Sequence, residues 1–342
     1  MPQPLKFAIV GAGVIAHFHA KALSHLAGGE LVAVADNQPE VGRQFAETYG
    51  IPSVYTDYEE MLKRDDIDCI CVCTPSGLHG EVVIAAAQAG KHVFCEKPLE
   101  ITSEKMQRMI DVCRQNRVKL GCVFQRRVMP ASLAVKKAVE AGKLGKPLLG
   151  DAYLKYYRSP EYYRSAGWRG TWELDGGGAL MNQGVHGIDV IQWLMGDVQS
   201  VFAYSAALAR DIEVEDTAVA VLKYKSGAFG VIQGTTSVYP GLETSFALHG
   251  EKGSILFADS GIKQWSFLGS DEPIPQVEGR VNSSSDPSKI ASDGHFVLLE
   301  DFVEAIHEDR DPLVTGEEAK KSVDLILAIY ESSRSGREIQ LA

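Results

Sequence analysis

The sequence predicts an α/β domain with a parallel, doubly wound sheet, followed by an α+β domain with a large, mostly antiparallel open sheet. In the first part of the chain, short apolar strands alternate with helical segments, and a glycine-rich turn follows the first strand. Longer segments that alternate between apolar and polar residues appear only after residue 125. We therefore expect two domains, residues 1–124 and residues 125–342.

The first strand, residues 7–10, is a continuous apolar run, which is typical of a strand buried on both faces. It enters the turn Gly11-Ala12-Gly13-Val14-Ile15-Ala16, which has the G-x-G-x-x-A pattern of dinucleotide-binding (Rossmann) domains. The first glycine permits a tight turn, the second lets a pyrophosphate approach the backbone, and the small third residue lets helix and strand pack closely. The helix that follows offers its free N–H groups to the phosphates.

The second strand, residues 31–35, ends in Asp36, twenty residues after Ala16. A carboxylate at this place accepts hydrogen bonds from a ribose 2′-hydroxyl and repels a 2′-phosphate. Asn37 adds no compensating positive charge, so the sequence predicts NAD in preference to NADP. Asp36 is equally suited to cap the helix expected over residues 39–49.

Two further strands of the first domain end in polar turns. Thr74-Pro75 follows one strand, and Glu96-Lys97-Pro98 follows the next, where Pro98 ends the strand because it lacks an N–H. Since ligands bind at the carboxyl ends of parallel strands, both turns are expected beside the cofactor. His79 either contacts the cofactor or packs at the start of a helix. The remaining elements expected here are strands 69–73, 93–95 and 118–123 and helices 57–63, 81–89 and 103–116.

The second domain begins with a helix over residues 130–141 and continues as a sheet with a hairpin turn at 225–227. One face of so broad a sheet is expected to form an oligomer interface, because an open apolar face needs covering. Helices are expected over 188–194, 296–307 and 316–332, a polar loop over 269–293, and strands over 148–157, 198–208, 217–224, 229–236, 244–248 and 254–257.

The segment between the first two of these strands is rich in aromatic residues, arginines and glycines. Flat rings and forked guanidinium donors suit sugar rings and carboxylates or phosphates. Asn182 and His186 are four residues apart, so they share a face on a helix or turn. The expected substrate contacts are Lys97, Arg126, Tyr163, Trp168, Arg169, Asn182, His186 and His295.

Composition narrows the class of protein further. The net charge of −11 argues against binding to nucleic acids or anionic membranes, and no apolar run is long enough to span a bilayer. The N-terminus lacks a signal-peptide pattern, so we expect a cytoplasmic protein. All six cysteines lie within the first 122 residues without the spacing of a metal site, and we expect buried, reduced thiols and no metal.

Taken together, these motifs resemble the Gfo/Idh/MocA family, the group of glucose–fructose oxidoreductase and inositol dehydrogenase. The matching pieces are the glycine turn, Thr74-Pro75, Glu96-Lys97-Pro98, and the stretch from Gly176-Gly177-Gly178 through His186 to Asp189. The resemblance implies a dinucleotide domain, a substrate domain with an open sheet, and dimers or tetramers formed through that sheet. It also implies hydride transfer between the hydroxyl carbon of a sugar and NAD.

The family's site, carried over to this chain, consists of Lys97, His186 and an aspartate at position 182, where this sequence has Asn182. An asparagine there resembles the branch that oxidises UDP-N-acetylglucosaminuronate at C3, and the run 167–172 resembles that branch and some 3-keto-glycoside dehydrogenases. We expect Lys97 or His186 to be the base, oriented by Asn182. The expected cofactor contacts are Gly11, Gly13, Val14, Ile15, Ala16, Asp36, Asn37, Thr74, Pro75, His79, Glu96 and Lys97.

Two alternatives to a sugar 3-dehydrogenase remain at this point. The first is an inositol dehydrogenase within the same family. The second is a sensor without turnover, because the family also includes a transcriptional repressor of galactose genes that binds a dinucleotide. The presence of both Lys97 and His186 favours an enzyme.

Overall fold

The chain forms two compact units in a computed structural model that describes residues 3–277 and 293–341. One unit comprises Met1–Gln125 and Ser292–Lys320, and the other comprises Arg126–Ala291 and Lys321–Ala342. This division differs from the expected boundary, because helix α9 (Asp293–His307) packs on helix α1 (Ala16–His25) of the first unit. Within the described ranges, every helix is too short or too polar to cross a membrane.

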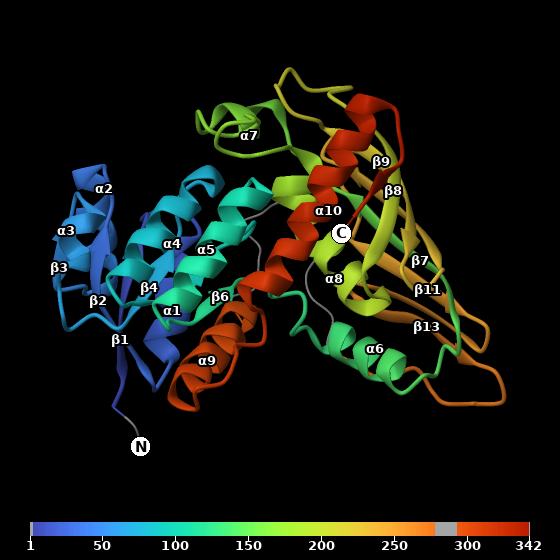
Figure 1. Ribbon diagram of the computed structural model, residues 1–342, viewed down its shortest axis with the longest axis horizontal. Helices are drawn as coiled ribbons and strands as arrows, with labels where there is room; N and C mark the ends of the chain where they lie inside the picture. The colour runs from blue at the N-terminus through green and yellow to red at the C-terminus, as the bar shows by residue number, and fades with distance from the viewer. Residues whose placement is uncertain (1–2, 278–292, 342) are drawn as a thin grey trace. The chain divides into compact units, whose positions relative to one another are not determined.

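The first unit is built on a six-stranded parallel sheet with the strand order β3-β2-β1-β4-β5-β6, which confirms the predicted doubly wound sheet (Figure 1). The order reverses between β1 and β4, and ligands of such sheets bind at the carboxyl ends of the strands beside this point. The strands are β1 (Leu5–Val10), β2 (Gly29–Ala35), β3 (Ser53–Tyr55), β4 (Cys69–Val72), β5 (His92–Cys95) and β6 (Leu120–Cys122). Besides α1, the helices are α2 (Pro39–Tyr49), α3 (Tyr58–Leu62), the single turn η1 (Ser76–Leu78), α4 (His79–Gln88) and α5 (Ser103–Gln115).

The core of this unit contains all six cysteines, each buried and without a disulfide. Burial raises the pKa of five of these thiols, among them Cys71 and Cys95 on neighbouring strands. They therefore stay protonated and pack as small apolar side chains, as the sequence predicts.

The second unit contains an eight-stranded sheet with the order β13-β12-β11-β7-β10-β9-β8-β14. Among the described strand pairs of this second sheet, only β7–β10 is parallel, which confirms a mostly antiparallel sheet. The sequence did not predict β13 or the short β14. The strands are β7 (Pro147–Lys155), β8 (Val198–Ala206), β9 (Thr217–Tyr224), β10 (Phe229–Thr235), β11 (Ser245–Gly250), β12 (Gly253–Ala258), β13 (Gly261–Phe267) and β14 (Ile339–Gln340).

Helices cover one face of this sheet. Helix α8 (Val185–Met195) packs on β7, where a β-carbon on Gly187 would lie 2.3 Å from the side chain of Leu154, so only glycine permits the close approach (Figure 1). A π-helical turn, η2 (Ala179–Gly184), precedes α8, which begins three residues earlier than expected. The other helices are α6 (Pro130–Glu140), α7 (Pro160–Arg164) and α10 (Gly316–Ser335), which begins in the first unit and continues into the second.

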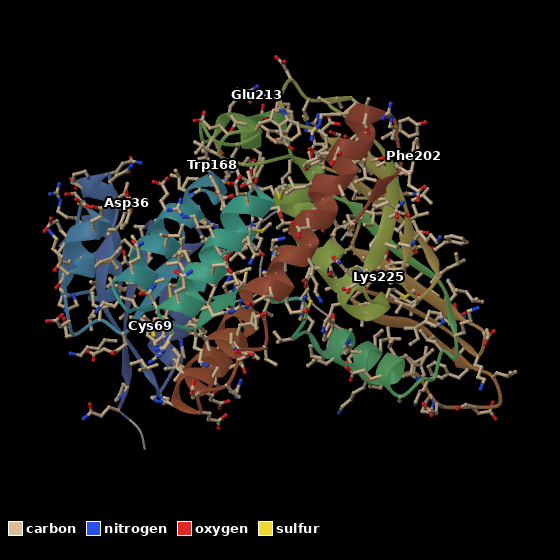
Figure 2. All side chains as sticks on the ribbon, viewed as in Figure 1. Asp36, Cys69, Trp168, Phe202, Glu213 and Lys225 are labelled. Atoms are coloured by element: carbon tan, nitrogen blue, oxygen red, sulfur yellow. The ribbon has the colours of Figure 1, made fainter. Side chains whose placement is uncertain are left out.

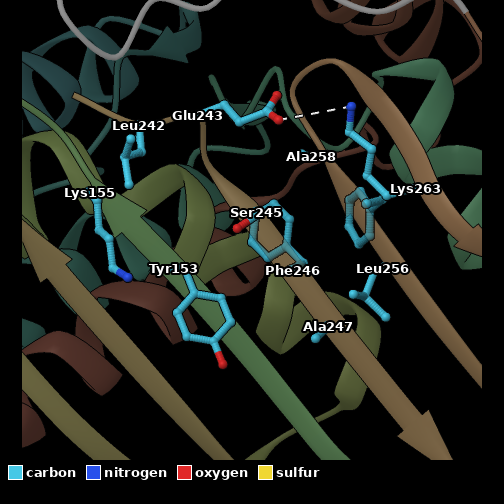
Figure 3. Close-up of a pocket in the computed structure, with 11 residues that line it drawn as sticks. Tyr153, Lys155, Leu242, Glu243, Ser245, Phe246, Ala247, Leu256, Ala258 and Lys263 are labelled. Atoms are coloured by element: carbon cyan, nitrogen blue, oxygen red, sulfur yellow. Dashed lines mark ion pairs between the residues drawn. The ribbon is translucent and has the colours of Figure 1, made fainter. Parts of the chain in front are cut away.

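The opposite face of the sheet exposes apolar side chains. Buried and exposed residues alternate strictly along most of β9, and Val219 and Val221 point to the exposed side. Phe229 of β10 is 56% exposed on the same face, since its neighbour Val231 pairs with Val221. A depression of about 460 Å³ between β7, β11 and β12 continues this face and is lined by Tyr153 among others (Figure 3).

Candidate active site

The glycine turn of the first unit has the geometry that a bound pyrophosphate requires. Gly11 has φ of +90°, and a β-carbon there would lie 2.7 Å from the carbonyl oxygen of Cys73, so no other residue fits. A β-carbon on Gly13, in contrast, would have no heavy atom within 4 Å, so the space above this residue is open. Val14, next in the turn, is 69% exposed, and Ile15 precedes the first residue of α1. The turn therefore fits a dinucleotide on the N-terminus of α1.

Asp36 connects this turn to the end of β2. Its Oδ2 accepts a hydrogen bond from the N–H of Ala12 at 2.8 Å, and its Oδ1 accepts one from the N–H of Gln38 at 2.9 Å (Figure 2). Helix α2 begins after Gln38 with no side-chain cap, so Asp36 orients the glycine turn instead of capping that helix. Asn37 follows on the exposed surface. The carboxylate remains available to a ribose hydroxyl, because each oxygen has a second lone pair.

His79 joins the two polar turns of this sheet edge. Its Nδ1 lies 2.9 Å from the carbonyl oxygen of Pro98, and its Nε2 lies 2.9 Å from the carbonyl oxygen of Thr74. The ring is 1% exposed, and burial lowers its pKa. Of the two roles that the sequence leaves open for His79, the structure favours packing over a cofactor contact: both ring nitrogens face backbone oxygens, and the ring holds the turn after β4 against the turn after β5.

Glu96 is held by two histidines in the interior of the first unit. Its Oε1 lies 2.8 Å from Nε2 of His19 and 3.2 Å from Nε2 of His295, and its Oε2 accepts the N–H of Lys97 at 3.1 Å. Burial favours the neutral acid, but the hydrogen bonds from both histidines hold the pKa of Glu96 well below its usual range. Burial also lowers the pKa of His19.

These contacts correct the expected role of His295, which we predicted as a substrate contact. Its imidazole is fully buried and packs against His19 and Phe18. Within the part of the chain that the structure describes, His19, Glu96 and His295 are the one group close enough together to hold a metal ion, and their separations also equal ordinary hydrogen bonds.

Lys97 follows this buried carboxylate at the end of β5. Residues 93–96 and 98–100 around it are all buried, whereas Lys97 itself is partly exposed. The backbone N–H of Lys97 is bonded to Glu96, so the ionised acid positions the lysine that comes next. This edge of the sheet thus presents a supported lysine beside the turn that contains Thr74 and Pro75.

In the second unit, Glu215 holds the turn that leads to Asn182 and His186. The carboxylate accepts hydrogen bonds from the N–H groups of Gly178 and Leu180, at 2.9 and 2.8 Å, and from the hydroxyl of Tyr330 at 2.8 Å. Its backbone is equally close, since a β-carbon on Gly178 would lie 1.8 Å from the carbonyl oxygen of Glu215. Burial raises the pKa of Glu215 to about 7.

Asn182 lies in η2 and the buried His186 in the first turn of α8, so they belong to consecutive helical elements of different type. The amide of Asn182 contacts two side chains that the sequence did not single out: its Nδ2 donates to Oδ1 of Asp175 at 2.5 Å, and its Oδ1 accepts from Nε2 of Gln183 at 2.7 Å. A buried ion pair between Arg127 and Asp189, at 2.7 and 2.9 Å, anchors the helix beyond them.

The remaining predicted substrate contacts differ in their surroundings. Arg126 pairs with the carboxylate of Asp259 and donates to Thr244 at 3.1 Å, so its guanidinium is already engaged within the second unit. Its role as a substrate contact stays a prediction, with Asp259 and Thr244 fixing the position of the guanidinium. The hydroxyl of Tyr163 lies 2.7 Å from that of Thr236.

Arg169 and Trp168 lie in the loop after α7, and both remain partly exposed. Figure 2 labels Trp168. The guanidinium of Arg169 lies 4.1 Å from the ring centre of Tyr162 and 5.5 Å from that of Trp168. This loop thus combines a guanidinium with flat aromatic faces, a combination suited to a sugar that carries an anionic group.

Comparisons with known proteins show similarity over nearly the whole chain. Residues 5–124 match a family model described as an oxidoreductase family with an NAD-binding Rossmann fold, and residues 132–256 match the GFO/IDH/MocA C-terminal domain. The chain is 30% identical to myo-inositol 2-dehydrogenase of Thermotoga maritima over 98% of both chains. It is 28% identical to D-glucoside 3-dehydrogenase of Escherichia coli over 99% of this chain and 98% of that one.

Among solved structures, the crystal structure of the WlbA dehydrogenase from Bordetella pertussis in complex with NADH and UDP-GlcNAcA aligns with a TM-score of 0.89. The two proteins are 37% identical, and the alignment covers 99% of each chain.

We predict that Glu215→Gln changes how stability depends on pH. Because the folded state binds a proton at Glu215 with a pKa of about 7, against 4.5 for a glutamate in water, this residue lowers the free energy of unfolding as pH rises from about 4.5 to 7. The contribution approaches about 1.4 kcal/mol per pH unit for one proton. Urea unfolding at several pH values measures this. The free energy of unfolding of the wild type, minus that of Glu215→Gln, should fall as pH rises from about 4.5 to 7. Glu213→Gln, at an exposed neighbouring position, is the control, and its stability should depend on pH as that of the wild type does. The same pH dependence in Glu215→Gln would contradict the assignment.

Proposed function

This chain belongs to the Gfo/Idh/MocA family of oxidoreductases, and we propose that it is an NAD-dependent dehydrogenase that oxidises a secondary hydroxyl of a sugar derivative. The observation that carries the proposal is the partly exposed Lys97, which a buried ionised carboxylate supports at the carboxyl edge of the dinucleotide-binding sheet. A lysine so placed can bind a hydroxyl group and take part in a proton transfer.

The chain's own residues would bind the cofactor and manage one proton. The turn from Gly11 to Ala16 would hold the pyrophosphate, and Asp36 the adenosine ribose. When bound, NAD⁺ supplies the hydride acceptor. Lys97 binds the reacting hydroxyl, and its uncharged amine, or His186, takes the proton as the carbon–oxygen bond becomes a carbonyl. Asn182 orients His186.

For the substrate, we favour a nucleotide-linked sugar acid that is oxidised at a ring carbon such as C3. The similarity to the Bordetella enzyme, whose crystal structure contains UDP-GlcNAcA, supports this class. The loop after α7 supports it as well, because the guanidinium of the partly exposed Arg169 lies 4.1 Å from the ring centre of Tyr162 and is suited to a carboxylate or phosphate. A glucoside or an inositol is the second candidate, supported by the similarity to the enzymes of Escherichia coli and Thermotoga maritima.

We predict that Lys97→Ala lowers kcat about a hundred- to ten-thousand-fold, the usual contribution of a positioned proton-transfer group. The dissociation constant for NAD⁺ should stay within a few-fold of the wild type, because the glycine turn and Asp36 are untouched. The assay follows nicotinamide reduction with UDP-sugar acids, glucosides and inositols. Lys21→Ala, an exposed change on α1, serves as the control.

Turnover of Lys97→Ala close to that of the wild type would contradict the assignment of this lysine. A wild type that binds NAD⁺ and reduces none of it with any of the sugars would instead favour the sensor.

We also predict that Asp36→Asn weakens the preference for NAD over NADP. The amide keeps an acceptor for the ribose and removes the negative charge that repels a 2′-phosphate. The ratio of dissociation constants for NADPH and NADH should fall at least about tenfold, equivalent to about 1.4 kcal/mol. Fluorescence titration of both cofactors measures it, and an unchanged ratio would show that Asp36 does not select the cofactor.

The exposed sheet face supports a further part of the proposal, a homo-oligomer formed through the second unit. Val219, Val221 and Phe229 place three large apolar side chains, each more than 40% exposed, on adjacent strands of one face. Soluble monomers rarely expose contiguous apolar patches of this kind. A second copy of the chain, packed sheet to sheet, would cover it.

Light scattering after size-exclusion chromatography tests this part. We expect the wild type to have at least twice the chain mass of 37.2 kDa, and Val221→Lys to shift the population to monomers. Leu133→Lys, the same change at an exposed position on α6, should leave the mass unchanged. A monomeric wild type would refute the interface, and so would an oligomer that Val221→Lys leaves intact.

A further inference from the structure

A chain of hydrogen bonds runs through the second unit from Arg158 to Asp175. Nη2 of Arg158 donates to Oε1 of Gln183 at 2.6 Å, and Nε2 of Gln183 donates to Oδ1 of Asn182 at 2.7 Å. Nδ2 of Asn182 then donates to Oδ1 of Asp175 at 2.5 Å. Three of these four residues lie outside the site that the sequence predicted.

The two end residues of this hydrogen-bonded series, Arg158 and Asp175, determine the orientation of the two amide groups between them. A guanidinium has only donors and a carboxylate only acceptors, so Gln183 must present its oxygen to Arg158 and Asn182 must present its nitrogen to Asp175. Turning the amide of Asn182 over would set oxygen against oxygen at Asp175 and nitrogen against nitrogen at Gln183. Only one orientation of the Asn182 amide therefore satisfies its neighbours.

The carboxylate at the end is itself held rigidly. Asp175 is 2% exposed, and its second oxygen, Oδ2, accepts the N–H of Gly170 at 2.9 Å. The backbone N–H of Asp175 bonds to the carbonyl oxygen of Thr171 at 3.2 Å. At the other end, Arg158 is 4% exposed. Hydrogen bonds to charged groups are strong when they are shielded from water, so each end constrains its neighbouring amide.

We propose that Asp175 is a positioning residue of the dehydrogenase: its buried carboxylate sets the orientation of the Asn182 amide and thereby the arrangement of the turn that leads into His186. This inference rests on the function proposed above, because it assigns Asp175 a task in that site. One hydrogen bond joins the carboxylate of Asp175 to Asn182. The negative charge of Asp175 therefore acts on the site through the neutral amide of Asn182.

An exchange of the two side chains tests the proposal. Asp175→Asn leaves one acceptor oxygen for two donors, the N–H of Gly170 and the amide of Asn182, and turns an NH₂ group toward one of them. Asn182→Asp sets two carboxylates against each other. The double variant Asp175→Asn/Asn182→Asp restores one amide and one carboxylate. In it, the new amide oxygen can accept from Gly170, the new amide nitrogen can donate to the carboxylate at position 182, and Gln183 can still donate to that carboxylate.

We expect each single variant to lose about ten- to a hundredfold in kcat, the range for one hydrogen bond to a charged group. The double variant should regain activity to within about tenfold of the wild type. Its pH profile should also move to higher pH, because a carboxylate four residues before His186 favours the charged imidazole. Asp211→Asn, at an exposed position of the same unit, is the control and should match the wild type.

A merely structural role would lower the melting temperature of Asp175→Asn and leave its kcat, KM and pH profile unchanged, which would overturn the proposal. A double variant no more active than the two single variants would overturn it as well.

A second measurement needs no turnover. It therefore distinguishes a failure of the Asp175–Asn182 contact from a failure of the proposed dehydrogenase function. The side-chain amide resonances of Asn182, identified by their loss in Asn182→Asp, should shift in the ¹⁵N–¹H spectrum of Asp175→Asn. Resonances that stay in place would overturn the orienting contact, whatever the substrate.

Discussion

The buried carboxylate of Glu96 is the interaction on which the first unit's site depends. Its hydrogen bonds connect α1, through His19, and α9, through His295, to the end of β5. A carboxylate in the interior is costly unless donors satisfy it, so the two imidazoles are required for the ionised form to persist. The same acid accepts the N–H of Lys97, which gives the candidate catalytic lysine a defined backbone in an otherwise buried turn.

Buried or partly buried acids have the same task at other turns in each of the two units. Asp36 accepts one N–H of the glycine turn and the N–H of Gln38, Glu215 accepts those at the start of η2, and Asp175 accepts one N–H and the amide of Asn182. Turns leave backbone donors without partners, and a carboxylate satisfies two or more of them at once. Hydrogen bonds to acidic side chains therefore hold the irregular segments that would contact cofactor and substrate.

The sequence predicted the fold and the cofactor turn because those signals are local: the apolar strands, the glycine spacing and the proline after Lys97 lie within short windows. It did not predict the partners of Glu96, since His295 lies 199 residues away and only tertiary packing brings it there. Asp175 follows no spacing rule either, because the loop after α7 that holds it is irregular. The partner of Arg126 was not predicted for the same reason, since Asp259 is 133 residues distant. Long-range pairs between single charged residues leave no periodic pattern in a sequence.

Transfer of hydrogen from a sugar carbon to the nicotinamide is the central claim, and isotope transfer measures it most directly. The wild type would be incubated with NAD⁺ and a UDP-sugar acid deuterated at its ring carbons, and the reduced cofactor would be analysed by mass spectrometry. We predict reduced cofactor that carries one deuterium atom per molecule. Saturating NAD⁺ binding without any labelled, reduced cofactor, repeated with deuterated glucosides and inositols, would contradict the account.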